Sequence, residues 1–277
     1  MQYQLTFTDW KPAFIIGSMA GKSNDEKSVT GRAFSVLTTF DPSHRHQTLT
    51  SIAKRAGLPL STTHRLVNEL VSLDALSRSA DGTYEIGSKI WRLGILASLH
   101  SDLREIALPY MEDVYQLTHG AVQIGVLDGL RCLIVERIAG SRTLSVLSKP
   151  GARLPLYASG VGKVLLSYGP KDVQDAVLQS LDPYTGKTIT DAKVLSSQLA
   201  AIKEKGFAYS EEELAIGATS LAVPVYGYGN RVIASLGIVA PAADTDLTRF
   251  LPVLKVSASA LSKKLISSGT ADLGQRL

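Results

Sequence analysis

The chain has 277 residues, 45% hydrophobic and 19% charged, which is long enough for two globular domains with buried cores. Its formal charge of +4 is mild, so any nucleic-acid binding must come from a local basic patch. One cysteine, Cys132, excludes a disulfide framework and a cysteine-rich zinc site and fits a reducing cytoplasm. Because no apolar run reaches the length of a membrane span, we predict a cytoplasmic protein without membrane contact.

The chain begins with an arm, residues 1–29, whose polar end "GKSNDEKS" predicts partial disorder. From Thr30 the apolar residues follow helical spacing, which predicts a helix with one buried face. This face is expected to consist of Ala33, Phe34, Val36, Leu37 and Phe40.

Two further helices are predicted in "TLTSIAKRAGLPLSTTHRLVNELVSLDAL". Thr50 is expected to cap the first, Gly57 supplies a turn of positive φ, and the second starts near Pro59. Two short helices joined through a glycine turn are typical of a helix-turn-helix, whose second helix enters the major groove by its N-terminal residues. The predicted DNA contacts on this helix are Ser61, Thr62, Thr63, His64 and Arg65.

A wing is predicted next, because "ALSRSADGTYEIG" is typical of strand, Asp-Gly turn and strand and completes a domain over 30–88. Between residues 30 and 72, five basic and two acidic residues give a local charge of +3. We therefore add Arg32, Thr50 and Arg78 to the expected DNA contacts. The alternative is a helical hairpin whose solvated basic face docks another protein. No His or Cys follows His64 at i+3 or i+4, which disfavours a metal site.

A linker helix is predicted over residues 89–104, since apolar residues recur there at helical spacing. The stripe continues to Leu117, and Pro109 predicts a break or a new helix start. An apolar helix beside a DNA-binding domain favours a homodimer, because two-fold related half-sites require one. In the alternative, the stripe packs on its own domain.

The second domain, residues 105–266, is predicted to be α+β, followed by a tail over 267–277. A hairpin is expected around Asp128-Gly129, a third strand in "TLSVLSKPG", and two long strands in "FAYSEEELAIGATSLAVPVYG" and "RVIASLGIVAP". Helices are expected in "PKDVQDAVLQSL" and "VLSSQLAAIKEKG" and over 246–264. One antiparallel sheet flanked by helices can form a cup for a small molecule.

The stretch "LPLYASGVGKVLLS", residues 154–167, predicts a helix capped by Ser159 with glycines at its start. It lacks the P-loop pattern, so a small anion at the helix N-terminus is favoured over a nucleotide, and an ordinary capped helix is the alternative. The run "SEEEL" at 210–214 suggests Glu212 as a general base. However, no nearby His, nucleophile elbow or metal pair supports an enzyme, and acidic runs are usually solvated. We predict neither cofactor nor metal; the alternative is a small-molecule enzyme with a helix-turn-helix docking domain.

Three stretches together resemble the IclR family of bacterial transcription regulators: "IAKRAGLPLSTTHRLVNEL", "LPLYASGVGKVLL" and "GFAYSEEELAIGATSLAVPVYGYGNRVIASLGIVAP". The resemblance covers residues 30–264. It implies a winged helix-turn-helix, a linker helix and a GAF-like effector-binding domain. It also implies dimers that pair into tetramers, and control of catabolic operons by small organic acids.

In such proteins the effector carboxylate meets backbone amides at a helix start that matches Gly160 and Val161. The remaining positions that match the family's pocket are Val146, Ser210, Ala218, Ser220, Gly237 and Val239. Ser220 stands where the family often has Cys, Ser210 where an acidic residue is common, and Gly237 and Val239 where some members have serines. We therefore expect a pocket that is roomier and less polar at its far end and takes an aromatic acid or its amide or hydrazide. Tyr157, where the family usually has His, is expected either to stack on the ring of such a ligand or to belong to the core.

Overall fold

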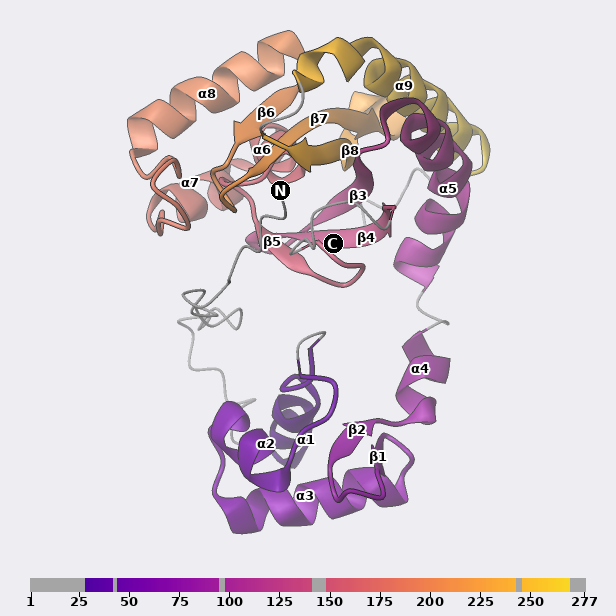
Figure 1. Cartoon of the computed structure of the whole chain (residues 1–277), viewed down its shortest axis with the longest axis vertical. Coiled ribbons are helices and arrows are strands. Elements are labelled where there is room, and N and C mark those ends of the chain that lie inside the picture. The colour runs from indigo at the N-terminus through magenta and orange to yellow at the C-terminus, as the bar shows by residue number, and fades with distance from the viewer. Residues whose placement is uncertain (1–27, 42–43, 95–97, 141–147, 243–245, 270–277) are drawn as a thin grey trace, which may run out of the picture. The chain divides into compact units, whose positions relative to one another are not determined.

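The structure is a computed structural model that describes residues 28–41, 44–94, 98–140, 148–242 and 246–269. The chain divides into two compact units, Met1–Ala97 and Ser98–Leu277 (Figure 1). Nearly all of the predicted N-terminal arm and most of the predicted tail lie outside the described residues. Within the described part, no helix is long and apolar enough to cross a membrane.

The first unit is a three-helix core with a two-stranded wing and one further helix. Its elements are α1 (Val29–Leu37), α2 (Leu49–Ala56), α3 (Leu60–Ser72), β1 (Leu76–Arg78), β2 (Tyr84–Ile86) and α4 (Ser88–Gly94). Val36, Ile52 and Leu66, one from each of the first three helices, meet in its buried core. The strands β1 and β2 pair antiparallel, as the predicted wing requires.

The turn of the predicted helix-turn-helix is confirmed, since Gly57 ends α2 with φ of 65°. Two local predictions are wrong. The cap of α2 is Thr48, which accepts a hydrogen bond from the Ser51 amide, and Thr50 lies inside the helix. Phe34 is 62% exposed, because it lies two residues and therefore about 200° around α1 from the buried Val36.

The connection to the second unit is helical on both sides, with α4 before residues 95–97 and α5 (Ser98–Thr118) after them. The predicted break near Pro109 is wrong, because Pro109 lies inside α5. The residues of α5 that are buried against the second unit's sheet are Leu103, Ala107, Met111 and Val114. This part of the apolar stripe therefore packs on its own domain, as the alternative held. A continuous linker helix over 89–104 stays a prediction, since residues 95–97 lie outside the described part.

The second unit contains a six-stranded antiparallel sheet in the order β5-β4-β3-β8-β7-β6. Its strands are β3 (Ala121–Asp128), β4 (Arg131–Ile138), β5 (Arg153–Pro155), β6 (Ala208–Glu211), β7 (Ala218–Tyr226) and β8 (Val232–Pro241). On one face pack α5 and α9 (Leu251–Ser267), which follows a short 3-10 turn at Leu247–Phe250. On the other face pack α6 (Gly160–Tyr168), α7 (Lys171–Leu178) and α8 (Ala192–Lys205) (Figure 1).

The predicted hairpin at Asp128-Gly129 is confirmed, with Gly129 at φ 56°. The expected third strand over 143–151 lies partly outside the described residues, and Ser148–Gly151 forms no strand. The stretch over 207–227 holds two strands instead of one long strand. A turn containing Gly217 at φ 78° folds β7 back on β6, which places Ser210 opposite Ser220. This pairing builds the polar end of the pocket described below.

Candidate DNA-binding helix and effector pocket

The predicted recognition helix α3 presents Ser61, His64 and Arg65 to solvent, with Thr62 half-buried. Thr63 does not belong with them. Its side chain is fully buried, and its hydroxyl donates a hydrogen bond to the Pro59 carbonyl, 3.0 Å away. Because no atom of the Thr63 side chain is accessible, we remove it from the set of DNA contacts.

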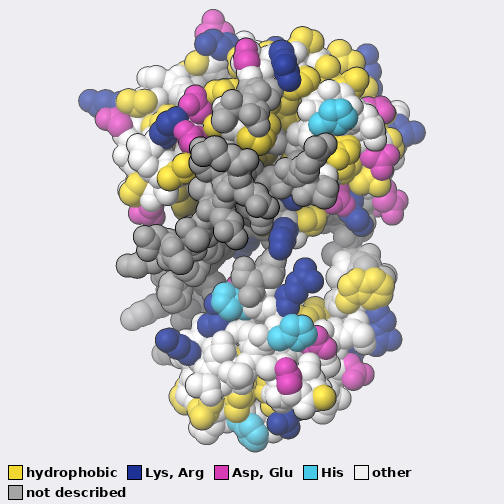
Figure 2. All heavy atoms as spheres, viewed as in Figure 1, with side chains coloured by type: hydrophobic (Ala, Val, Ile, Leu, Met, Phe, Trp, Pro, Cys, Tyr) yellow, Lys and Arg dark blue, Asp and Glu magenta, His cyan; other side chains and the backbone are white. Residues whose placement is uncertain are grey.

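The other predicted DNA contacts lie on separate elements of the first unit. Thr50 is exposed on α2, and Arg32 is half-buried on α1, where its Nε donates to the Ser28 carbonyl. Arg78 is exposed on the wing, its guanidinium carbon 5.7 Å from the centre of the Tyr84 ring. Basic and histidine side chains are scattered over the visible surface of this unit (Figure 2). The DNA-contacting role of each residue stays a prediction.

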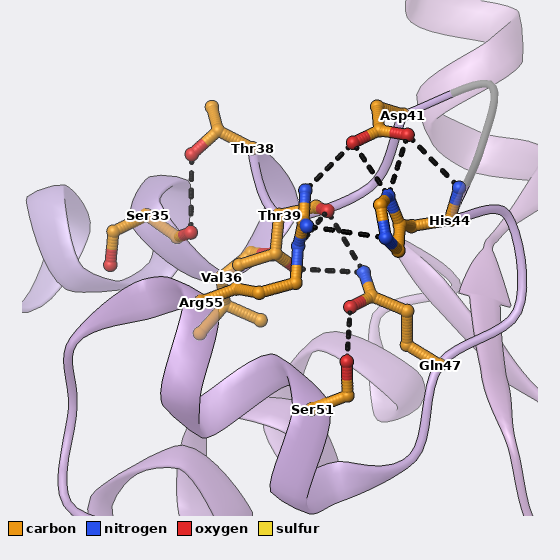
Figure 3. Close-up of polar contacts among 9 residues, drawn as sticks. All are labelled: Ser35, Val36, Thr38, Thr39, Asp41, His44, Gln47, Ser51 and Arg55. Carbon is orange, nitrogen blue, oxygen red and sulfur yellow. Dashed lines mark hydrogen bonds and ion pairs between the residues drawn. The ribbon is translucent and has the colours of Figure 1, made fainter. Parts of the chain in front are cut away.

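A polar network fixes α2 against the chain that follows α1 (Figure 3). Arg55 Nη2 pairs with Asp41 Oδ2 at 2.7 Å, and its Nε donates to the Thr39 carbonyl at 3.1 Å. His44 Nδ1 lies 2.9 Å from the same carboxylate, and the Gln47 amide also donates to the Thr39 carbonyl. The Arg55 guanidinium therefore stabilises contacts within the first unit, although its charge is part of the local positive charge counted in the sequence.

We expect Arg55→Ala to destabilise the first unit by about 1 kcal/mol, because it removes a charge-assisted pair that is partly screened by solvent. Thermal unfolding of the full chain measures this loss. Lys54→Ala removes the same charge from an exposed neighbouring position and is the matched control, with no expected change in unfolding. Equal midpoints for the two variants would contradict the structural role of Arg55.

A pocket lies in the second unit beside the N-terminus of α6 and the ends of β6, β7 and β8. Its open volume is about 40 Å³, which exceeds the roughly 10–15 Å³ that a single water molecule needs. Its polar lining residues are Gln123, Ser148, Ser159, Ser210, Thr219 and Ser220. Its apolar lining residues are Leu154, Ala158, Leu214, Ala215, Ala218 and Val239.

Sequence reasoning predicted part of this lining. Ser210, Ala218, Ser220 and Val239 contribute to it as the resemblance implied, and Val146 lies outside the described residues. The lining is more polar than expected, since Gln123, Ser148 and Thr219 were missed. Gln123 lies on the hairpin strand β3, 87 residues before Ser210 on β6. No local sequence pattern therefore connects it with the pocket.

Gly160, Val161 and Gly237 lie just behind the lining and allow α6 to approach the sheet. The Gly160 amide donates to Ser220 Oγ at 3.1 Å. A Cβ at Gly160 would lie 2.9 Å from Ser220 Oγ, and one at Gly237 would lie 2.9 Å from a Val161 methyl carbon. The two glycines therefore permit a close contact that larger residues would prevent.

Tyr157 does not line the pocket. Its ring is buried in the core on the α6 face of the sheet, 6.0 Å from the Tyr184 ring, and its hydroxyl donates to the Asp182 carbonyl at 2.8 Å. The expected stacking on a ligand ring is therefore wrong. The apolar body of Tyr157 packs in the core, while its hydroxyl finds a backbone partner.

The helix cap predicted at Ser159 is confirmed, since its Oγ accepts from the Gly162 amide. Four residues later, on α6, Lys163 is fully buried and forms an ion pair with Glu213. Burial lowers the pKa of the Lys163 ammonium, and the adjacent Glu213 carboxylate partly offsets this. The expectation that the acidic run is solvated is thus wrong at Glu213. Sequence reasoning missed this pair because its members are 50 residues apart.

Glu213 belongs to a loop that covers the pocket, since the next two residues, Leu214 and Ala215, line it. The Thr185 and Thr188 hydroxyls donate to the Glu212 and Glu213 carbonyls at 2.6 Å each. Together with the buried ion pair, these bonds hold the loop in place.

Glu212 is tied into this loop. Its carboxylate accepts from the Gly217 amide and pairs with Lys187. The hydrogen bond from Lys187, followed by that from Gly217, keeps the pKa of Glu212 below its usual value. A general base at neutral pH needs a raised carboxyl pKa, so this environment disfavours that role. Among the described residues, no group of three or more His, Cys, Asp or Glu side chains could hold a metal ion.

Two family models match the chain. The model "IclR helix-turn-helix domain" matches residues 29–80, and "Bacterial transcriptional regulator IclR C-terminal" matches residues 96–263. The chain belongs to the IclR family. It is therefore a bacterial transcriptional regulator of the IclR type with a DNA-binding helix-turn-helix.

Among characterised relatives of this IclR protein is the HTH-type transcriptional regulator XynR of Escherichia coli, 30% identical over 240 residues, 84% of this chain and 95% of XynR. The regulator KipR of Bacillus subtilis is 30% identical over 193 residues, 69% of this chain and 77% of KipR. Among solved structures, an IclR homolog of Microbacterium hydrocarbonoxydans, complexed with 4-hydroxybenzoate, matches with TM-score 0.80 and 33% identity. That match covers 86% of this chain and 99% of the homolog.

Proposed function

We propose that this IclR-family protein is a cytoplasmic regulator of a catabolic operon that responds to a small organic acid bound in the pocket of its second unit. The observation that carries the proposal is the pocket itself, which is lined by buried polar side chains and covered by a loop held through the Lys163–Glu213 pair. The homolog complexed with 4-hydroxybenzoate supports an aromatic acid or a derivative of one.

The acid group is proposed to lie at the start of α6. Helix N-termini attract anions, since their first amides lack partners within the helix and the helix dipole is positive there. The Val161 amide is such a donor, while the Gly160 amide already donates to Ser220 Oγ and so directs the Ser220 hydroxyl proton toward the acid as a second donor. No lining residue is charged, so hydrogen bonds would hold the carboxylate.

We propose that α3 reads operator DNA through Ser61, His64 and Arg65, while Arg32, Thr50, Thr62 and Arg78 contact phosphates or sugars. Exposed hydroxyl, imidazole and guanidinium groups at the start of a recognition helix suit these contacts. The chain would act as a homodimer, as paired half-sites require, and such dimers could associate into tetramers. Similarity to the E. coli repressor AllR, 26% identical over 223 residues, favours repression.

Fluorescence anisotropy tests this function. The purified chain is titrated onto the DNA upstream of its own gene and onto a scrambled duplex at two salt concentrations. We expect binding to the native duplex to survive the higher salt and binding to the scrambled duplex to be lost. Adding 4-hydroxybenzoate or another small acid should then change the affinity for the native duplex. Equal, salt-sensitive binding to both duplexes would contradict a sequence-specific regulator of that DNA.

We expect Ser220→Ala to weaken the response to the acid by about five- to tenfold in acid concentration, because one hydrogen bond to the ligand is lost. The dose–response curve of the anisotropy assay measures the shift. Ser196→Ala removes an exposed hydroxyl on α8 and is the matched control. A Ser220→Ala curve that coincides with the curve of this control would remove Ser220 from the proposed acid site.

A further inference from the structure

Two of the polar side chains that line the pocket already donate their hydroxyl protons within the protein. The Ser159 hydroxyl donates to the Pro155 carbonyl at 3.0 Å, and the Ser210 hydroxyl donates to the Ala158 carbonyl at 3.1 Å. Neither of these serines has its proton left for a ligand. Other polar side chains of the pocket have hydrogen-bonding groups that no protein group satisfies.

Three polar groups among the described residues that line the pocket remain open to a ligand. Ser220 Oγ accepts from the Gly160 amide, which leaves its own proton without an acceptor. Ser148 Oγ and Gln123 Oε1 are buried and have no hydrogen-bond partner. Both side chains line the pocket and are at most 2% exposed. Because buried polar atoms in folded proteins nearly always have a partner, these atoms leave hydrogen-bonding positions in the pocket that a ligand or a water molecule can fill.

The open acceptor, Gln123 Oε1, and the proposed acid site at Ser220 lie on different strands of the sheet. Gln123 on β3 pairs with Gly237 on β8, and Ser220 on β7 pairs with Val239 on β8. Gln123 and Ser220 are therefore two strand spacings apart across the sheet and two residues apart along it, about 12 Å between backbones. Gly237 lies opposite Gln123, and a Val161 methyl group packs over it. Because Gln123 and Ser220 line the same pocket, a ligand in it can meet Ser220 with one end and Gln123 with the other.

We propose that the effector is an acid that carries a hydrogen-bond donor, such as a hydroxyl or amide N–H group, opposite its carboxylate, and that Gln123 Oε1 selects this donor. The inference rests on the proposed function, since it deepens the chemistry of the same pocket. Ser148, which can donate or accept, lies in the same lining and tolerates either kind of group. An acid without a donor leaves the Gln123 carbonyl oxygen unpaired, which lowers its affinity.

Calorimetric titration of the full chain with matched acids tests the inference. The acids are 4-hydroxybenzoate, whose hydroxyl lies opposite the carboxylate, and 3-hydroxybenzoate, whose hydroxyl lies one ring position away from that place, each compared with benzoate. We expect the tightest-binding hydroxy acid to bind about tenfold more tightly than its donor-free counterpart. Equal or weaker binding of the hydroxy acids overturns the inference and leaves the effector pocket standing. A panel in which no acid binds overturns both the inference and the proposed acid-responsive function.

Gln123→Met keeps the length of the side chain and removes the acceptor. We expect this variant to bind benzoate as the wild type does and to lose the preference for the hydroxy acid. Its ligand-free melting temperature should equal or exceed that of the wild type, because an unpaired buried atom is removed. The role of Gln123 is overturned if the variant still prefers the hydroxy acid over benzoate. It is also overturned if the ligand-free melting temperature falls, because Gln123 would then make a hydrogen bond within the protein. If the variant does not fold, the wild-type comparison alone decides.

Discussion

Lys163→Met is expected to destabilise the second unit by about 3–5 kcal/mol, since it leaves the buried Glu213 carboxylate without its ammonium partner. Glu213 is only 6% exposed, and its Oε2 already has no hydrogen-bond partner, so the protein offers this charge little compensation. Urea unfolding of the full chain, followed by circular dichroism, measures the loss. The same substitution should also weaken acid binding, because Glu213 holds the loop over the pocket.

The control for this experiment is Lys171→Met, which makes the same substitution in an exposed pair with Asp175 and should leave unfolding unchanged. In the double variant Lys163→Met/Glu213→Leu the orphaned charge is gone, so stability should recover relative to Lys163→Met alone. A Lys163→Met protein as stable as its Lys171→Met control would show that the buried pair does not hold the fold together.

Arg65→Ala is expected to cost about 1–3 kcal/mol of operator binding if its guanidinium makes a bidentate base contact. Arg65 is exposed near the start of α3, and nothing in the described part of the first unit engages its guanidinium. The substitution should therefore leave the thermal unfolding of the chain unchanged, unlike Arg55→Ala. Anisotropy with the native duplex, compared with a duplex carrying single base changes, measures the lost discrimination.

The matched control is Arg249→Ala, which removes an exposed guanidinium from the second unit and so reproduces the change in net charge. It should leave specific binding and its salt dependence close to those of the wild type. If Arg65→Ala binds the operator as tightly as the Arg249→Ala control, Arg65 does not read DNA. Binding that weakens uniformly on all duplexes would instead assign Arg65 to a phosphate.

The prediction of family and of two domains succeeded because its signals are local. Gly57 at the turn between α2 and α3, Asp128-Gly129 between β3 and β4, and Ser159 before α6 each specify a backbone conformation through their own chemistry. Their order along the chain also carries the resemblance to the IclR family. None of these features depends on a partner that is distant in sequence.

Predictions about individual side chains were less reliable, because helical periodicity identifies a face and does not identify what covers it. Thr63 follows the pattern of an N-terminal recognition residue, yet α3 rotates it into the core. Tyr157 lies beside the cap of α6, yet its hydroxyl bonds to the Asp182 carbonyl, 25 residues away. Phe34 fits an apolar stripe, yet it is exposed, because only the face of α1 that carries Val36 packs against the core.

The sequence by itself therefore determined the family and the two domains, and the resemblance predicted an effector site at the start of α6. The tertiary structure decided that Lys163 pairs with Glu213 and that Gln123 faces the pocket with an unpaired acceptor. The physical reason is that backbone conformation follows from neighbouring residues. Burial, ion pairing and unsatisfied hydrogen bonds depend instead on residues that only folding brings together.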